Sequence, residues 1–312
     1  MGKASRTKVD ASRREKIAAQ RAAERRAEQR RRILIASGSV IAVIAIVVAF
    51  IVIKANNKPS SGNSSNGPTG AALSSVVSKV TSVPASTLDK VGTGSFNGKI
   101  QAVSGATPLT SNGKPEMLYM GAEYCPYCAA ERWAMVVALS RFGTFSGLST
   151  VHSASVSGAG SSEPFPNTPT FTFHGSTYTS KYLTFTPVEM QTNVPDKASG
   201  GYTNLETPTS AQNALITKYD APPYVTAGNQ GAIPFMYFGG KYVSVGASYD
   251  PQVLSGLTWD KIASQLSNPN SAVAKAIDGT ANNITAAICK MTGNQPASAC
   301  TAAVQSLESQ LK

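Results

Sequence analysis

The 312-residue sequence predicts an α/β domain that is tethered to a membrane by one N-terminal helix. Two patterns predict the α/β class. An apolar run of strand length at 115–121 leads within a few residues into a helical pattern at 129–140, and residues 168–186 alternate with the period of two that is typical of strands. The tether is predicted because residues 33–53 carry no charge. A hydrophobic content of 42% is ordinary for a chain that buries a core and excludes a wholly disordered protein.

The positive charge of the chain lies mainly in an N-terminal tail. The formal net charge is +11, and residues 1–32 hold twelve Lys/Arg against four Asp/Glu. The rest of the chain therefore carries a net charge of only +3, which gives no electrostatic footprint for nucleic acid. Residues 11–32 are rich in Ala, Arg, Glu and Gln and predict a cytoplasmic helix that orients the membrane span and attracts lipid. Binding of nucleic acid or of a partner is the alternative for this helix.

The uncharged segment 33–53 predicts a transmembrane helix. Its 21 residues span the hydrocarbon layer of roughly 30 Å at about 1.5 Å per residue. A cleaved signal peptide is the competing interpretation, but its apolar region is usually about 7–15 residues long and follows a short basic part. Twelve basic residues before the span, against Lys54 and Lys58 just after it, place the N-terminus in the cytoplasm. Residues 54–70 predict a flexible linker, so the folded part is expected outside the cytoplasmic membrane.

The first elements after the linker are predicted by local patterns. Val76, Val77 and Val80 predict one face of a short helix that ends before Pro84. Residues 96–103 alternate and predict a strand, after which the chain enters the apolar run at 115–121.

The sequence predicts a pair of cysteines at the start of a helix. The predicted order is a strand, a short turn, Cys125-Pro126-Tyr127-Cys128 and then the helix. Unpaired N–H groups and the positive end of the dipole at a helix start stabilise a thiolate, which predicts Cys125 as a nucleophile. Pro126 suits the first helical turn, and Cys128, further into the helix, is predicted to be the resolving thiol. Half of a zinc site and an inert structural disulfide are the alternatives. The only two histidines of the chain lie in no spaced ligand motif.

Two motifs resemble the thioredoxin superfamily. The first is residues 119–128 (YMGAEYCPYC) followed by a helix, in which the Pro-Tyr pair is typical of glutaredoxins. The second is residues 231–243 (GAIPFMYFGGKYV), which resembles the cis-proline loop of the superfamily with Ile233-Pro234 at the cis bond; two apolar strands and a final helix follow. In more detail the chain resembles the membrane-anchored thioredoxin-like proteins grouped as DUF929, over most of residues 85–312.

The resemblance implies a thioredoxin-like domain at 71–268 with a β-rich insertion at about 161–230. Pro234 follows Cys125 by 109 positions, which is farther than in a minimal member of the superfamily. The Thr- and aromatic-rich residues 168–186 predict added or extended strands in this interval.

The resemblance also raises the question of a proton acceptor near the cysteines. Tyr119 occupies about the place at which thioredoxin has a buried Asp. Glu123 and Glu131 are candidate substitutes, but each is expected to be a solvated charge near the helix start.

The two remaining cysteines predict a disulfide-stapled helical hairpin at 269–312. Cys289 lies near the end of one helical pattern and Cys300 lies near the start of another, at 299–311. An even number of cysteines in an extracytoplasmic chain favours their pairing. A second redox pair that relays electrons with the CxxC cysteines is the alternative.

Together these features predict a membrane-anchored, extracytoplasmic thiol–disulfide oxidoreductase that acts on protein cysteines through Cys125 and Cys128, with no metal or cofactor. The expected partners are protein substrates with thiols or disulfides, an unidentified redox partner and the lipid membrane, but no nucleic acid. The alternative is a non-catalytic thioredoxin-like binding or adaptor protein in which the CxxC pair is a locked disulfide. The resemblance implies substrate contacts at the residues that flank the cysteines and at the proline loop, namely Tyr124, Pro126, Tyr127, Ile233 and Pro234.

The charge asymmetry across residues 33–53 leads to a test of topology. Protease added to intact cells or right-side-out vesicles should remove the chain after residue 54 and leave the basic tail protected. The measurement is an immunoblot against a tag at each end of the chain. A C-terminal domain that stays protected would contradict the orientation and, with it, the extracytoplasmic assignment.

Overall fold

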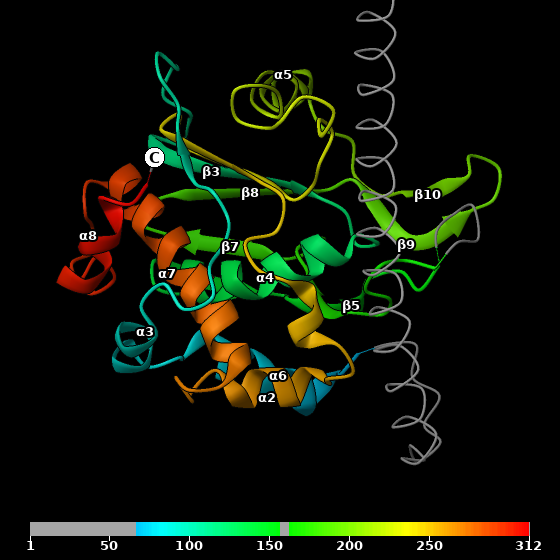
Figure 1. Cartoon of the computed structure of the whole chain (residues 1–312), viewed down its shortest axis with the longest axis horizontal. Helices are drawn as coiled ribbons and strands as arrows, with labels where there is room; N and C mark the ends of the chain where they lie inside the picture. Colours follow the sequence, from blue (N-terminus) through cyan, green and yellow to red (C-terminus); the bar gives the residue numbers. More distant parts are fainter. Residues whose placement is uncertain (1–66, 157–161, 312) are drawn as a thin grey trace, which may run out of the picture. The chain divides into compact units, whose positions relative to one another are not determined.

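The structure of the chain is a computed structural model that describes residues 67–156 and 162–311 (Figure 1). The predicted basic tail at 1–32, the membrane span at 33–53 and most of the linker lie outside the described residues. Within the two described ranges, no helix is both long and apolar enough to cross a membrane.

A mixed six-stranded sheet lies at the centre of the described chain (Figure 1). Its strands are β1 (Gln101–Ala102), β2 (Thr110–Ser111), β3 (Lys114–Gly121), β8 (Thr184–Glu189), β11 (Phe235–Phe238) and β12 (Tyr242–Val245). β8 runs parallel to β3, whereas β11 runs antiparallel to both β3 and β12. β1 pairs with β12 at one edge, and β2 pairs with the start of β3.

Helices surround this sheet. The described residues form α2 (Gly70–Thr81), α3 (Ala85–Val91), α4 (Pro126–Leu139), α5 (Ser210–Tyr219), the 3₁₀-helix η1 (Pro251–Leu254), α6 (Trp259–Gln265), α7 (Ala272–Thr292) and α8 (Ala302–Glu308). The helix predicted around Val76 is confirmed as α2, in which Val76 and Val80 are buried.

The central strands are buried on both faces because their side chains alternate between two cores. Tyr119 of β3 and Phe238 of β11 belong to the larger core, which also contains residues of α4 and α7. Met120 and Phe235 belong to a smaller core, to which α5 contributes Tyr219. The sheet is therefore covered by helices on both sides, and Tyr119, two residues before the end of β3, lies in the larger core together with residues of α4.

The strand predicted at 96–103 forms only at Gln101–Ala102, where it pairs with β12. The N–H of Phe96 closes a local turn, and the N–H of Asn97 bonds to the carbonyl of Ser248 at 2.9 Å. These bonds take the backbone of the earlier residues away from the ladder, which is why the alternating pattern predicted too long a strand.

The interval between α4 and β11 is rich in strands, and those outside the central sheet start earlier than the predicted insertion at about 161–230. They form three two-stranded sheets, two of which begin before residue 161, while β8 belongs to the central sheet. Alternating Thr and aromatic residues fit a partly buried strand in the central sheet and in a two-stranded sheet alike. The pattern alone therefore does not show to which sheet a strand belongs. The three pairs are β4 (Gly143–Ser146) with β7 (Thr177–Ser180), β5 (Ser149–His152) with β6 (Pro169–Thr172), and β9 (Gln191–Asp196) with β10 (Gly201–Asn204).

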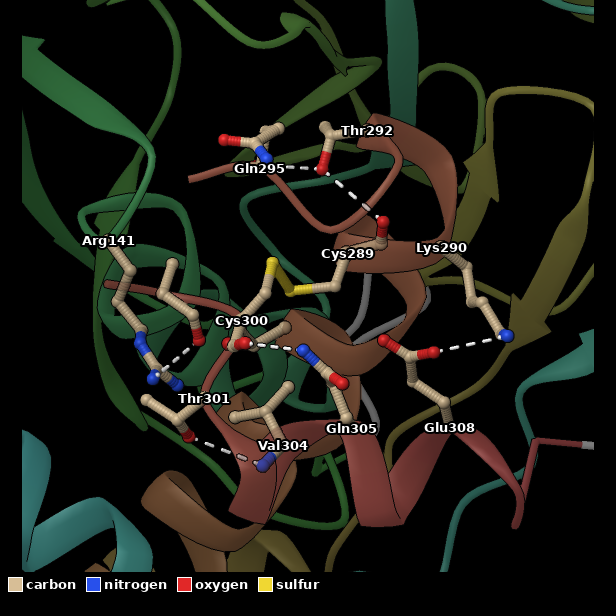
Figure 2. The surroundings of a disulfide bond; sticks show 12 residues. Arg141, Cys289, Lys290, Thr292, Gln295, Cys300, Thr301, Val304, Gln305 and Glu308 are labelled. Atoms are coloured by element: carbon tan, nitrogen blue, oxygen red, sulfur yellow. Dashed lines mark hydrogen bonds and ion pairs between the residues drawn. A yellow bond between two sulfur atoms is a disulfide. The ribbon is translucent and has the colours of Figure 1, made fainter. Parts of the chain in front are cut away.

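The C-terminal hairpin is closed by the predicted disulfide between Cys289 and Cys300, whose Cα atoms are 5.7 Å apart (Figure 2). Gly293 ends α7 with a φ of +64°, a left-handed conformation that favours glycine and turns the chain back. An ion pair between Lys290 and Glu308, at 3.1 Å, gives a second link between the two helices.

The second helix of the hairpin is shorter than the predicted 299–311, because Thr301 caps α8. Its hydroxyl accepts the N–H of Val304 at 3.4 Å (Figure 2). Just before the cap, the carbonyl of Ala299 accepts a hydrogen bond from Arg141 at 2.8 Å. The segment after α4 is thereby tied to the disulfide region.

Asp278 of α7 is a fully buried carboxyl group, and neither of its oxygens has a hydrogen-bond partner in the described chain. Burial raises the pKa of Asp278 from 3.8 to about 8. The unfolded chain releases this proton above about pH 4, whereas the folded chain holds it until about pH 8. The free energy of unfolding should therefore fall as the pH rises through this window.

We expect Asp278→Asn to raise the free energy of unfolding at pH 8 by about 1–3 kcal/mol, because the amide needs no proton to stay neutral. At pH 4 the same substitution should have little effect. Urea denaturation at the two pH values measures the difference, and Asp89→Asn at an exposed position is the control. An equal change at both pH values would contradict this account.

Candidate active site

Cys125 lies at the start of α4, four residues after the end of β3. It is the N-cap of the helix, with φ −73° and ψ 120°, and its Sγ accepts the N–H of Cys128 at 3.2 Å. Pro126 occupies the first helical turn, where its missing N–H leaves no carbonyl without a partner. The local sequence thus holds the sulfur at the positive end of the helix.

The two cysteines of the motif, which are not bonded to each other, differ in the pKa of their thiols. Burial raises the pKa of Cys125, but hydrogen bonds from the side chain and backbone of Cys128, with the charge of Arg132, outweigh burial and lower it. Burial and the hydrogen bond with Cys125 raise the pKa of Cys128 well above its usual value. The exposed fractions are 4% for Cys125 and 0% for Cys128. Cys125 therefore has the lower pKa and the greater exposure, as predicted, although both thiols are buried.

The loop before β11 brings Ile233 to Cys125 across 108 positions of sequence. The Ile233–Pro234 bond is cis, as predicted, and the carbonyl oxygen of Ile233 accepts from the Sγ of Cys125 at 3.7 Å. The carbonyl of Pro234 accepts the N–H of Gly246 at 2.8 Å, which ties the loop to the residue after β12. The structure therefore brings the two sequence motifs together at one sulfur atom.

Asp220, at the end of α5, anchors the same loop, a role that the sequence pattern did not predict. Its Oδ2 accepts the N–H of Gly231 at 2.7 Å, and burial raises its pKa. Gly231 has a φ of +83°, a backbone conformation that residues with a side chain rarely adopt. The sequence signal for this contact was limited to the glycine, because nothing in the pattern pairs it with an acid eleven residues earlier.

Aromatic rings line one side of the motif. Tyr124 stacks on Tyr202 of β10 with ring centroids 4.0 Å apart, and Tyr127 meets Phe165 edge-on at 5.7 Å. Tyr127 is 40% exposed and accessible to a partner, whereas Tyr124 uses one face of its ring in the stack and Pro126 is buried. Among the residues expected to contact substrate next to the cysteines, Tyr127 is thus the most open.

A buried ion pair between Arg132 and Glu189, which the sequence pattern did not predict, lies next to the cysteines. Nε and Nη2 of Arg132 donate to the two carboxylate oxygens of Glu189 at 2.8 and 2.6 Å, and both side chains are fully buried. Nη2 also donates to the carbonyl of Ala122 at 2.7 Å. Arg132 follows Cys128 by four positions and shares its face of α4. The available signal was an arginine that, with Glu131, interrupts a largely apolar helix.

Glu123 and Glu131 are buried, which corrects the expectation that each is a solvated charge. Glu131 accepts the N–H and the O–H of Ser248, both at 2.9 Å, and burial raises its pKa to about 7. Burial also raises the pKa of Glu123. The expectation failed because elements distant in sequence cover the start of α4. Across the described ranges, no cluster of three or more His, Cys, Asp or Glu residues is suited to hold a metal ion.

A comparison with family models assigns the chain to a protein family. The model for "Domain of unknown function (DUF929)" matches residues 101–290, more than half of the sequence, and the chain belongs to this family. The match includes both CxxC cysteines and the Ile233–Pro234 loop, and it ends between Cys289 and Cys300. No curated protein and no solved structure gave a significant match.

The difference between the two thiols predicts an order of labelling. Iodoacetamide at about pH 6 should alkylate Cys125 well before Cys128, because the thiolate reacts and its population follows the pKa. Mass spectrometry of the peptide that carries both cysteines, after short labelling times, measures the order. Cys125→Ser should abolish the fast phase and Cys128→Ser should retain one. Equal labelling of the two cysteines in the unaltered chain would contradict the assignment.

Proposed function

We propose that this member of the DUF929 family is a thiol–disulfide oxidoreductase that acts on protein cysteines, with Cys125 as the nucleophile and Cys128 as the resolving thiol. The observation that carries the proposal is the unequal pair of thiols at a helix start, with the carbonyl of Ile233 at 3.7 Å from the more acidic sulfur. A purely structural bridge requires no such difference in acidity.

The proposed fold is that of the thioredoxin superfamily. β3 leads into the CxxC motif and α4, and the Ile233–Pro234 loop leads into the hairpin β11–β12, after which α6 follows. This chain order is the one on which the resemblance rests, and the contact between Cys125 and Ile233 supports it. The three two-stranded sheets are then additions to that fold, and they flank β8 in the sequence.

In the proposed reaction, the Cys125 thiolate attacks one sulfur of a substrate disulfide. A mixed disulfide forms, and the other substrate sulfur leaves as a thiolate. The Cys128 thiolate then attacks the Cys125 sulfur, which closes the Cys125–Cys128 disulfide and releases the substrate as a dithiol. The reverse sequence oxidises a substrate dithiol, and the potential of the redox partner sets the direction. We assign substrate contact to Tyr127 and to the backbone next to Pro234.

We further propose that the domain works outside the cytoplasmic membrane, anchored by residues 33–53, on protein substrates and an unidentified redox partner. The charge asymmetry across that segment supports this location. The bonded pair of Cys289 and Cys300 also supports it, because disulfides persist in oxidising compartments.

A non-catalytic adaptor with a locked CxxC disulfide is the second candidate. The low exposure of Cys125, at 4%, favours it, because a buried sulfur is less accessible to a protein substrate. The reduction potential of the pair separates the candidates. A potential below about −300 mV indicates a structural bridge, whereas a potential in the range of known oxidoreductases indicates exchange.

Trapping of partners tests the catalytic roles. Cys128→Ser removes the resolving thiol and keeps the nucleophile, so it should accumulate mixed disulfides with substrate proteins. Non-reducing gels should show these as high-mass bands that disappear on reduction. Cys125→Ser should trap far fewer partners, because the remaining thiol is fully buried and has a raised pKa. If neither variant traps a partner, or if both variants form equal amounts of mixed disulfide, the result favours the adaptor.

A further inference from the structure

Two buried hydrogen-bond donors near the cysteines have no acceptor in the described part of the chain. They are the hydroxyl of Tyr119 and Nη1 of Arg132, and both side chains are fully buried. A buried polar group without a partner destabilises the folded chain. An acceptor that forms only during part of the reaction explains two such groups at a candidate active site.

The hydroxyl of Tyr119 lies toward the end of β3 from which the CxxC turn departs. Tyr119 and Gly121 share one face of the strand. A β-carbon at Gly121 would overlap the hydroxyl oxygen of Tyr119, so the glycine leaves the space in which this hydroxyl lies. Burial, and to a smaller degree a charge on Cys128, raises the pKa of Tyr119 well above its usual value. The hydroxyl therefore stays protonated and acts as a donor.

Arg132 approaches the same place from α4. Its Nε and Nη2 are occupied by Glu189 and by the carbonyl of Ala122, which leaves only Nη1 without an acceptor in the described ranges. Its guanidinium carbon lies 5.9 Å from the centre of the Tyr119 ring. Arg132 is one helical turn beyond Cys128 on the same face of α4. Cys128 also lies close enough for its charge to affect the pKa of Tyr119, and for the charge of Arg132 to lower the pKa of Cys128.

We propose that Tyr119 and Arg132 donate hydrogen bonds to the thiolate of Cys128 in the resolving step. The two residues are thus catalytic residues of the proposed exchange reaction, on which this inference rests. The structure shows no hydrogen bond from either donor to the Cys128 sulfur, and the thiolate, a much stronger acceptor than the neutral thiol, is the group that draws both donors to it. The ionisable groups around Cys128 are Cys125, Tyr119 and Arg132, with Glu189 paired to the arginine. The Arg132–Glu189 pair has no net charge before Cys128 ionises. The negative charge of the Cys128 thiolate is therefore stabilised by hydrogen-bond donors and is not repelled by a net negative charge.

The step balances without a further reactant. Cys128 loses a proton to solvent, and its thiolate attacks the Cys125 sulfur of the mixed disulfide. The Cys125–Cys128 bond forms while the bond between Cys125 and the substrate sulfur breaks. The substrate sulfur leaves with the electron pair and takes a proton from solvent. Tyr119 and Arg132 keep their protons throughout and stabilise the attacking thiolate.

The full chain in detergent, reduced at the CxxC pair, is mixed with 5,5′-dithiobis(2-nitrobenzoate). Attack by Cys125 releases a first equivalent of coloured thionitrobenzoate and leaves a mixed disulfide. Attack by Cys128 then releases a second equivalent. Stopped-flow absorbance between pH 6 and pH 9 separates the two phases and gives the pH dependence of each.

Tyr119→Phe should slow the second phase at least about tenfold at pH 7 and move its midpoint to higher pH by about one unit, as expected for loss of a hydrogen bond to a charged group. The first phase should change by less than about threefold. Tyr237→Phe is the matched control, because Tyr237 is also a buried tyrosine of the sheet but belongs to the smaller core on the opposite face. It should leave both phases within about twofold.

Gly121→Ala provides a second variant, because its methyl group displaces the hydroxyl without removing it. It should slow the second phase as well. A folded Tyr119→Phe variant with an unchanged second phase would overturn the donor assignment. If circular dichroism shows that Tyr119→Phe does not fold, an unchanged second phase in Gly121→Ala would overturn it instead. A wild-type chain that never releases the second equivalent would overturn the exchange reaction itself, and the donor assignment with it.

Discussion

The ion pair between Arg132 and Glu189 is the interaction on which the surroundings of the cysteines depend. It joins α4 to the end of β8, and the additional bond from Arg132 to the carbonyl of Ala122 fixes the turn that leads to Cys125. Removal of one partner of a buried ion pair costs about 3–5 kcal/mol, because the other charge is left uncompensated. Neighbouring elements exclude water from the pair, and they cover α4 along almost its whole length.

The small two-stranded sheets provide much of that cover, and they bind α4 by hydrogen bonds as well as by apolar contacts. The indole N–H of Trp133 donates to the carbonyl of Pro169 at 2.8 Å, and the hydroxyl of Thr170 donates to the carbonyl of Ala129 at 2.8 Å. As a result, Tyr127 is the one exposed side chain of α4. The same cover explains why the Cys125 sulfur is so little exposed. In the proposed reaction, a substrate contacts Tyr127 and the loop before β11.

Short sequence segments predicted the local structure, and the errors came from burial by distant parts of the chain. The CxxC helix start and the Cys289–Cys300 staple each depend on residues close together in the sequence, so spacing was sufficient. Arg132 pairs with a residue 57 positions away, and pattern analysis assumes that a charged side chain of a helix faces water. The same assumption misplaced Glu131. Alternation in 168–186 indicates strands but not their neighbours, so β8 could not be assigned to the central sheet.

The pairing of Arg132 with Glu189 also determines how this site can stabilise a thiolate. An unpaired buried arginine would act on both cysteines through its full charge. With Glu189 as its partner, much of that long-range field cancels, and the directional N–H groups remain. Stabilisation then comes from short contacts such as the N–H of Cys128 at 3.2 Å from the Cys125 sulfur. Buried interactions over such distances are screened far less by salt than exposed charges are. The difference in acidity between the two thiols should therefore persist over a wide range of ionic strength, unlike an activation that depends on surface charge.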